Sequence, residues 1–229
     1  MGEPGPDAPQ RPFPRELLAG DTLAAARALL GARLVREPQP GDPAGEPRVG
    51  RIVELEAYIG EDDRASHARF GRTARNAVMF GPPGHAYVYL VYGMHHCLNV
   101  VTEPASRPAA LLVRAVEPIT GMASMHAARA VTRTARGRAR ATGASPPPDT
   151  RLAAGPGLVC AAFSIDRTHT GVDLCDPASP LRLELANDGE APPAIATTPR
   201  IGIGYAGEPW VGVPWRFVVP DSPSLSRRA

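Results

Sequence analysis

The sequence predicts an α+β fold: a single domain with a curved, mostly antiparallel sheet, packed helices and a protruding β-hairpin. The chain has 229 residues, of which 43% are hydrophobic, so it can bury one core near the upper end of single-domain size. Strand and helix patterns do not alternate in the rhythm of a parallel sheet, which favours antiparallel pairing. The stretch "AYVYLVYGMHHCLNVVT" has the form of a hairpin. We expect residues 1–12, rich in Pro and Gly, to be a disordered tail and residues 13–225 to form the domain.

The first elements are a helix and a loop. In "PRELLAGDTLAAARALLGARLVR" (14–36) apolar residues recur at helical spacing after Asp21, a suitable N-cap residue. The stretch "EPQPGDPAGEPRVG" (37–50) is rich in turn-forming residues and predicts a loop.

A strand follows over "RIVELEAYIG" (51–60). Its alternation places Val53, Leu55 and Ala57 on one face and Glu54, Glu56 and Tyr58 on the other. Two carboxylates on one face are ordinarily a solvated sheet surface. Here the face also carries an aromatic ring, and His67 follows soon after, which is how a pocket would hydrolyse a bond through an activated water. From the residues alone, both interpretations remain open.

The hairpin holds three of the five tyrosines of the chain, Tyr87, Tyr89 and Tyr92. If Gly93, Met94 and His95 form the loop, Tyr92 lies opposite His96 and Tyr89 opposite Asn99. The tyrosines could simply be strand formers that fill a core. Alternatively, Tyr92 at the tip is suited to wedge between stacked bases, and Tyr89 could offer a flat face to a base turned out of the stack.

The remaining elements complete the α+β pattern. We expect a strand over 108–118, with Leu112 and Arg114 on one face, a helix over 119–136, and a short helix in "GPGLVCAAFSI" with Pro near its start. The last third predicts short strands and turns. Within it, "GIGYAG" (202–207) has the letters of a dinucleotide-binding fingerprint, but Pro209 follows almost at once, so we interpret it as a turn.

Charge is unevenly distributed. All 25 basic residues are arginine, so no side-chain lysine is present to form a Schiff base. Five arginines fall between Arg129 and Arg140, and no acidic residue lies between Glu117 and Asp149. This segment could meet a polyanion or be a solvated basic face.

Several classes of protein are disfavoured. No stretch approaches the roughly 18 apolar residues of a membrane span, and the N-terminus lacks an apolar signal core, so we expect a cytoplasmic protein with no membrane contact, nucleoid-associated if bacterial. The three cysteines lack a CxxC pair and are expected to be reduced. Adjacent histidines on a strand, His95 and His96, point to opposite faces and cannot easily share an ion, so we expect no metal.

Several motifs together resemble one family. They are "RIVELEAYIG", "SHARFGRTARNAVMFGPPGHAYVYLVYGMHHCLNVV", "LLVRAVEP", "GPGLVCAAFSID" and "RIGIGYAG…PWRF", and they run from about Leu23 to Ser222. In this order they resemble the alkyladenine (3-methyladenine, or methylpurine) DNA glycosylases. The resemblance implies a single-domain enzyme that works without a metal or other cofactor and leaves the DNA backbone uncut.

The resemblance also implies a role for particular residues. Glu56 matches the carboxylate that activates the attacking water, and Arg114 an arginine that helps to hold that water. The side chains that match the walls of the base pocket are Tyr58, His67 and Tyr89. Asn99 matches the residue that clashes with the amino group of normal guanine. Tyr92 matches the side chain that enters the minor groove, with Met94 beside it.

The implied partner is double-stranded DNA that contains damaged purines, bound by a monomer. We expect phosphate contacts from Arg72, Arg75 and Ser222, with sequence-independent, salt-sensitive affinity. The chain departs from the family at Leu158, where members often have lysine in a "GPGK" segment, and this puts one phosphate contact in doubt.

Two other functions remain open. The first is a non-catalytic nucleic-acid-binding module with the same fold, and the second is a glycosidase of free nucleosides. Glu56 argues against the first, because a pure binder has no need of a carboxylate that repels phosphate. The tyrosine wedge and the basic segment argue against the second.

Overall fold

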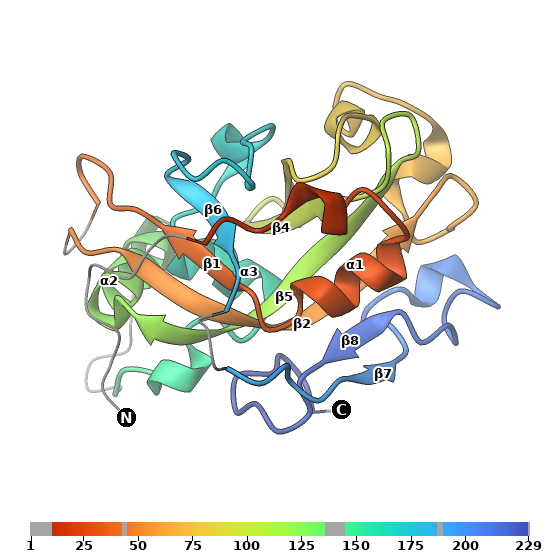
Figure 1. Cartoon of the computed structure of the whole chain (residues 1–229). Coiled ribbons are helices and arrows are strands. Elements are labelled where there is room, and N and C mark those ends of the chain that lie inside the picture. The colour runs from red at the N-terminus through yellow and green to blue at the C-terminus, as the bar shows by residue number, and fades with distance from the viewer. Residues whose placement is uncertain (1–10, 43–44, 136–144, 187–189, 229) are drawn as a thin grey trace.

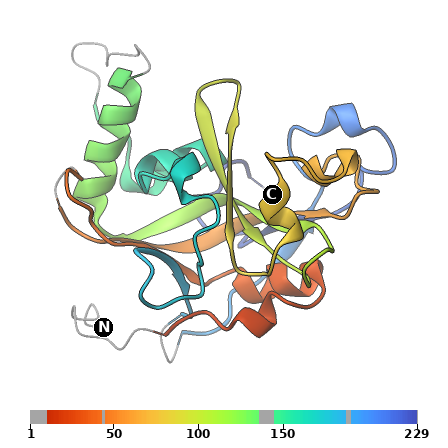
Figure 2. The same ribbon diagram turned by 90° about the horizontal axis from the view of Figure 1, so that it is seen from above.

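The computed structural model describes residues 11–42, 45–135, 145–186 and 190–228. An eight-stranded sheet lies between helix α1 on one face and helices α2 and α3 on the other (Figures 1 and 2). All strand pairs are antiparallel. The α+β class with a mostly antiparallel sheet is therefore confirmed.

The elements have the following bounds. The helices are α1 Thr22–Leu29, α2 Met122–Ala135 and α3 Pro156–Ala162. The strands are β1 Arg33–Arg36, β2 Arg48–Ile59, β3 Ala86–Val91, β4 His95–Val101, β5 Ala109–Thr120, β6 Leu181–Glu184, β7 Ala196–Thr198 and β8 Arg216–Val218. Short 3₁₀ turns occupy Arg15–Leu17, His67–Phe70, Ala77–Phe80, Asp149–Arg151, Arg167–His169 and Gly204–Ala206.

The sheet is built around the long strands β2 and β5. Its order is β3-β4-β5-β2-β1-β6, and the β7–β8 pair joins β2 along Glu54–Glu56. The pairing of β2 with β5 shifts register on each side of Glu54, and such bulges re-aim side chains locally. The irregularity falls where the two carboxylates and Arg114 lie, so it positions the candidate site.

The N-terminal region follows the prediction in part. Asp21 caps α1, since its Oδ1 accepts a hydrogen bond from the Ala24 N–H at 2.9 Å. The predicted helical stretch is wrong at its end, because residues 33–36 are the strand β1, hydrogen-bonded between β2 and β6. Residues 48–50 of the predicted loop likewise belong to β2. In both cases sheet pairing overrides the local pattern.

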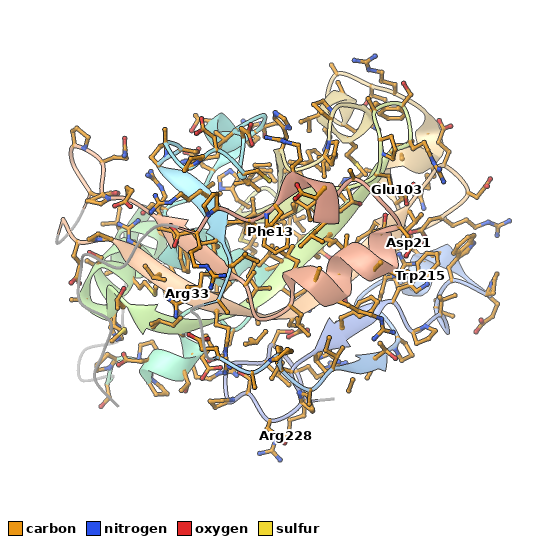
Figure 3. All side chains as sticks on the ribbon, in the orientation of Figure 1. Phe13, Asp21, Arg33, Glu103, Trp215 and Arg228 are labelled. Carbon is orange, nitrogen blue, oxygen red and sulfur yellow. The ribbon has the colours of Figure 1, made fainter. Side chains whose placement is uncertain are left out.

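The start of the chain is held against the sheet at its described part. Pro12 forms a bridge with Glu184, and Phe13 is 1% exposed in the core, where Figure 3 labels it. Residues 1–10 of the predicted tail lie outside the described residues. Three arginines of the basic segment also lie outside the described residues: Arg136, Arg138 and Arg140.

The hairpin β3–β4 projects from the body of the molecule (Figure 2). Its predicted register is wrong by two residues: Tyr89 pairs with Cys97, and Tyr87 pairs with Asn99. The loop consists of residues 92–94, because Tyr92 and Gly93 both take positive φ, 52° and 67°, and the Met94 N–H donates to the Val91 carbonyl. A shift of two keeps every side chain on its predicted face, so Tyr87, Tyr89 and Asn99 still share one face.

Two further expectations can be compared with the structure. The predicted helix 119–136 begins later, at Met122, because residues 119 and 120 extend β5 and Gly121 turns the chain with φ of 78°. The "GIGYAG" stretch is a 3₁₀ turn, as expected.

Among the described residues, no helix is long and apolar enough to span a lipid bilayer. The three cysteines are free.

Candidate active site

A small hollow gathers aromatic side chains from distant parts of the chain. Its volume is about 50 Å³. It is lined by Tyr58, Ala65, His67, Met79, Tyr87, Tyr89, Asn99, Ala110 and Tyr205. The structure thus brings together all four predicted base-binding residues, Tyr58, His67, Tyr89 and Asn99. Their roles toward a base remain predictions.

His67 is held as a neutral ring. Its Nδ1 lies 2.9 Å from the Tyr87 hydroxyl, and its ring meets the Tyr89 ring edge-on with centroids 4.5 Å apart. Burial, together with the nearby cations of Arg75 and Arg69, lowers the pKa of His67 from 6.5 to about 4. Burial also raises the pKa of Tyr87 to about 12. Near neutral pH, therefore, the pocket wall carries an uncharged imidazole and a protonated phenol.

Asn99 is fixed on the pocket wall by the backbone of the hairpin. Its Nδ2 donates to the Tyr87 carbonyl at 2.9 Å, and the residue is 4% exposed. Since the amide nitrogen is engaged with the strand, the side chain has a defined orientation. A fixed polar group in a pocket can discriminate between ligands by steric exclusion.

Glu56 is bonded to Tyr58 of the hollow's wall and is fully buried. Its Oε2 accepts hydrogen bonds from the Tyr58 hydroxyl at 2.9 Å and from Arg114 Nη1 at 3.3 Å, and its Oε1 accepts one from the Ile201 N–H at 2.6 Å. Burial, followed by the charge of Glu56, raises the pKa of Tyr58 well above its ordinary value, so Tyr58 remains a donor. The solvated-surface interpretation of the carboxylate pair is therefore wrong.

A second carboxylate, Glu54, lies behind Glu56 and is also fully buried. Arg114 Nε donates to Glu54 Oε1 at 2.9 Å, and Arg216 Nε to the same oxygen at 2.8 Å. Burial alone would raise the pKa of Glu54, but the Arg114 charge and the hydrogen bonds from Arg216 and Ser226 outweigh it and lower the pKa. Burial would lower the pKa of Arg114, yet Glu56 and Glu54 raise it. Arg114 is thus shared by two buried carboxylates.

An inner ion pair holds two segments of the site. Arg200 binds Asp63 in a bidentate pair at 2.6 and 3.0 Å, and Arg200 is 5% exposed while Asp63 is fully buried. The Arg200 guanidinium also lies over the rings of Tyr58 and Trp215, 4.8 and 5.0 Å from their centroids. This pair anchors the chain just before His67 and just before the Ile201 N–H that binds Glu56.

The predicted wedge lies at the hairpin tip. Tyr92 is 86% exposed and Met94 38%, so neither side chain is part of the core. A larger hollow of about 730 Å³ lies between this tip and helices α2 and α3, with Met94, Val131 and Arg167 in its lining. Its lining contains no tyrosine, whereas the smaller hollow includes Tyr58, which is bonded to Glu56. The smaller aromatic hollow is therefore the better candidate for chemistry.

The three predicted phosphate contacts are not equivalent. Arg72 and Arg75 are both exposed, and the Arg75 guanidinium lies 5.6 Å from the ring centroid of the pocket residue Tyr89. Ser222 lies apart from them, 8% exposed, and its hydroxyl donates to Glu117 at 3.0 Å.

Sequence reasoning missed several residues of the site. Strand periodicity could have identified Tyr87 and Glu54, since each shares a strand face with a predicted site residue. Tyr205 and Arg200 lie within a quoted motif, but no spacing linked them to the pocket. Ser226, which binds Glu54, had no signal. Among the described residues, no three His, Cys, Asp or Glu side chains group as a metal site.

Comparison with known proteins agrees with this geometry. The sequence model of the methylpurine-DNA glycosylase (MPG) family matches residues 16–223. The chain belongs to this family. A relative from Methanocella arvoryzae, provisionally named a 3-methyladenine DNA glycosylase, is 48% identical over 95% of this chain and 96% of its own length. A relative with the same provisional name from Anaeromyxobacter dehalogenans is 45% identical over 95% of this chain and 87% of its own length. Another, from Myxococcus xanthus, is 45% identical over 94% of this chain and 93% of its own length. The resemblance inferred from the motifs is confirmed.

Proposed function

We propose that this protein is a monofunctional DNA glycosylase that removes alkylated purines from double-stranded DNA; whether hypoxanthine and ethenoadenine are further substrates is decided by the test below. The single observation that carries the proposal is the buried Glu56 carboxylate, which accepts a hydrogen bond from Tyr58 in the wall of an aromatic hollow. A non-catalytic binding module has no need of such a group. The names of the relatives point to the same substrate class.

The first step is extrusion of the target nucleotide. A base inside a duplex is out of reach of Glu56, so the nucleotide must rotate out, at a cost of a few kcal/mol that is lower for a damaged base. Tyr92, exposed at the projecting tip, enters the minor groove and fills the gap, with Met94 beside it. Exposed arginines such as Arg72 and Arg75 bind phosphates and supply salt-sensitive affinity.

The second step is recognition of the flipped base. Tyr58, Tyr89 and the neutral His67 ring form the walls on which the base stacks. Asn99, held by the Tyr87 carbonyl, occupies the space that the amino group of normal guanine would need. The pocket thereby accepts damaged purines and resists guanine.

The third step is hydrolysis of the N-glycosidic bond. Glu56 orients a water molecule toward the anomeric carbon and takes its proton as the C–O bond forms and the C–N bond breaks, with the bonding pair leaving on the base. As an anion it also stabilises the oxocarbenium-like transition state. A positively charged methylated base leaves without a further proton, whereas a neutral base requires one. With no lysine in the chain, a side-chain lysine lyase step does not follow, and the product is an abasic site in an intact strand.

The test is excision from duplex oligonucleotides that each carry one lesion. Wild-type protein would be incubated with a 3-methyladenine, 7-methylguanine, hypoxanthine or ethenoadenine duplex, and strands analysed with and without alkali. We expect release of at least one of these bases, with cleavage appearing after alkali treatment. Cleavage before alkali would contradict the monofunctional assignment. Binding of duplexes with no release from any lesion would favour the non-catalytic module, and activity on free nucleosides alone would favour the nucleoside glycosidase.

A further inference from the structure

Glu54 is a buried carboxylate that takes no part in the walls of the aromatic hollow. It accepts four hydrogen bonds: from Arg114 Nε at 2.9 Å, from Arg216 Nε at 2.8 Å, and from the Ser226 hydroxyl and N–H, each at 2.7 Å. A carboxylate bound by this many donors is rigid, and burying it without a function would be costly. Glu54 and Glu56 both accept hydrogen bonds from Arg114, which suggests that Glu54 acts on the catalytic group.

The connection runs through Arg114, whose guanidinium is divided among three partners. Nε donates to Glu54, Nη2 to the Ser226 hydroxyl at 3.2 Å, and Nη1 to Glu56 at 3.3 Å. A guanidinium that is free to turn tends to bind a carboxylate through two parallel N–H···O bonds. Such a pair with Glu56 would occupy the lone pairs that a water molecule needs.

We propose that Glu54 and Ser226 are positioning residues that hold the Arg114 guanidinium so that one of its N–H groups, and not two, reaches Glu56. This inference rests on the proposed role of Glu56 in hydrolysis. The Ser226 hydroxyl accepts from Arg114 and donates to Glu54, so it completes the link between them. Oε1 of Glu56, which accepts one hydrogen bond, from the Ile201 N–H, then keeps a lone pair for the attacking water.

The C-terminal segment is built to keep Ser226 in place. Arg151 Nη1 donates to the Leu225 carbonyl at 2.8 Å, and Arg216 Nη2 donates to the Arg227 carbonyl at 2.5 Å. The residues on both sides of Ser226 are thus bonded to the body of the domain. Ser226 lies beyond residues 16–223, the part matched by the family, so this role is inferred from the geometry of this chain alone.

The test compares Glu54→Gln, Ser226→Ala and Ser226→Thr with wild type in single-turnover excision, with enzyme in excess so that the rate constant does not depend on the active fraction. Ser224→Ala is the matched control: Ser224 is buried in the same segment, and its hydroxyl has no hydrogen-bond partner among the described residues. The rate constant would be measured across pH for the lesion that wild type removes fastest, together with the Kd for the same lesion duplex and the Tm of each variant.

We expect Glu54→Gln to lower the rate constant by about tenfold and Ser226→Ala by about threefold, that is by roughly 1.4 and 0.65 kcal/mol of transition-state stabilisation. The Kd should stay within about twofold of wild type, and Ser226→Thr, which keeps the hydroxyl, should restore the rate. In Glu54→Gln the acidic limb of the rate profile should move to lower pH. Arg114 would then face Glu56 without the competing charge of Glu54.

The outcomes separate this inference from the proposed function. Excision by wild type with an unchanged rate constant and pH profile in Glu54→Gln would overturn the positioning role and leave the glycosylase assignment intact. So would a rate loss in Ser226→Ala that Ser224→Ala matches. Absence of excision by wild type on every lesion would refute the function itself, and with it any role of Glu54 in catalysis.

Discussion

The Arg200–Asp63 pair is predicted to be a main support of the site and of the fold around it. Arg200→Met keeps the apolar stem and removes the charge, which leaves Asp63 buried with hydrogen bonds from the Ile59 and Ala65 N–H groups but without its cation. Removing one partner of a buried ion pair costs about 3–5 kcal/mol. The two remaining N–H donors place the expected loss at the lower end, near 3 kcal/mol. For a chain of this size each kcal/mol corresponds to roughly 2–4 °C in Tm, so we expect a fall of about 6–12 °C.

The assay is urea unfolding followed by circular dichroism, with the free energy of unfolding extrapolated to water. The matched control is Arg107→Met, which removes a cation that is 73% exposed from Glu103, a buried carboxylate that also accepts from the Thr22 hydroxyl. Because solvent screens an exposed guanidinium, this pair should contribute about 0–1 kcal/mol, and the variant should remain close to wild type. Adding Asp63→Asn to Arg200→Met should recover part of the lost stability, because it removes the unpaired buried charge.

A loss below about 1 kcal/mol in Arg200→Met, similar to that of Arg107→Met, would refute this reasoning. The same conclusion would follow if Asp63→Asn added to the loss. In either case the segments that hold His67 and the Ile201 N–H would be supported by something other than this pair.

Three further predictions concern the pocket and its DNA contacts. The pKa of His67 in the folded state, about 4, lies below its ordinary value of 6.5, so between these two pH values the unfolded chain binds a proton that the folded chain does not. The free energy of unfolding of wild type should therefore decrease as pH falls from about 6.5 to about 4. Urea unfolding should show a smaller decrease for His67→Asn. Tyr92→Ala should leave the free energy of unfolding within about 0.5 kcal/mol of wild type and lower the rate of excision from a fully paired duplex by about tenfold. The rate should fall less when the lesion lies in a mismatch. Equal losses of rate on both substrates would contradict the wedge role of Tyr92. Leu158→Lys should tighten DNA binding and steepen by about 0.9 the slope of the logarithm of the binding constant against the logarithm of the salt concentration. Fluorescence anisotropy would measure this slope. An unchanged slope would show that position 158 makes no phosphate contact.

Much of the site was predictable because it depends on strand periodicity. Glu54, Glu56 and Tyr58 share a face of one strand, and Tyr89 and Asn99 share a face of the hairpin. The predicted register of the hairpin is wrong by two residues, but the predicted faces are still correct, since side chains alternate with a period of two. The α+β class followed from the same patterns.

The rest depends on contacts between segments far apart in the chain, for which local patterns carry no signal. Asp63 meets Arg200 across 137 residues, and Glu54 meets Ser226 across 172. The register of the hairpin was missed because Tyr92 adopts a positive φ, which is rare for a residue with a bulky side chain. Residues 33–36 were assigned to a helix because the pairing of β1 with β2 and β6 is not visible in their own sequence.

The central claim is that Glu56 activates the water that releases the base. The most direct measurement is the single-turnover rate of excision by Glu56→Gln on the lesion duplex that wild type processes, with the Kd for that duplex measured in parallel. We expect the rate to fall by at least about a hundredfold, at the lower end of what a general base contributes, while the Kd stays within a few-fold of wild type. Excision by Glu56→Gln at a rate close to that of wild type would contradict the catalytic role of Glu56.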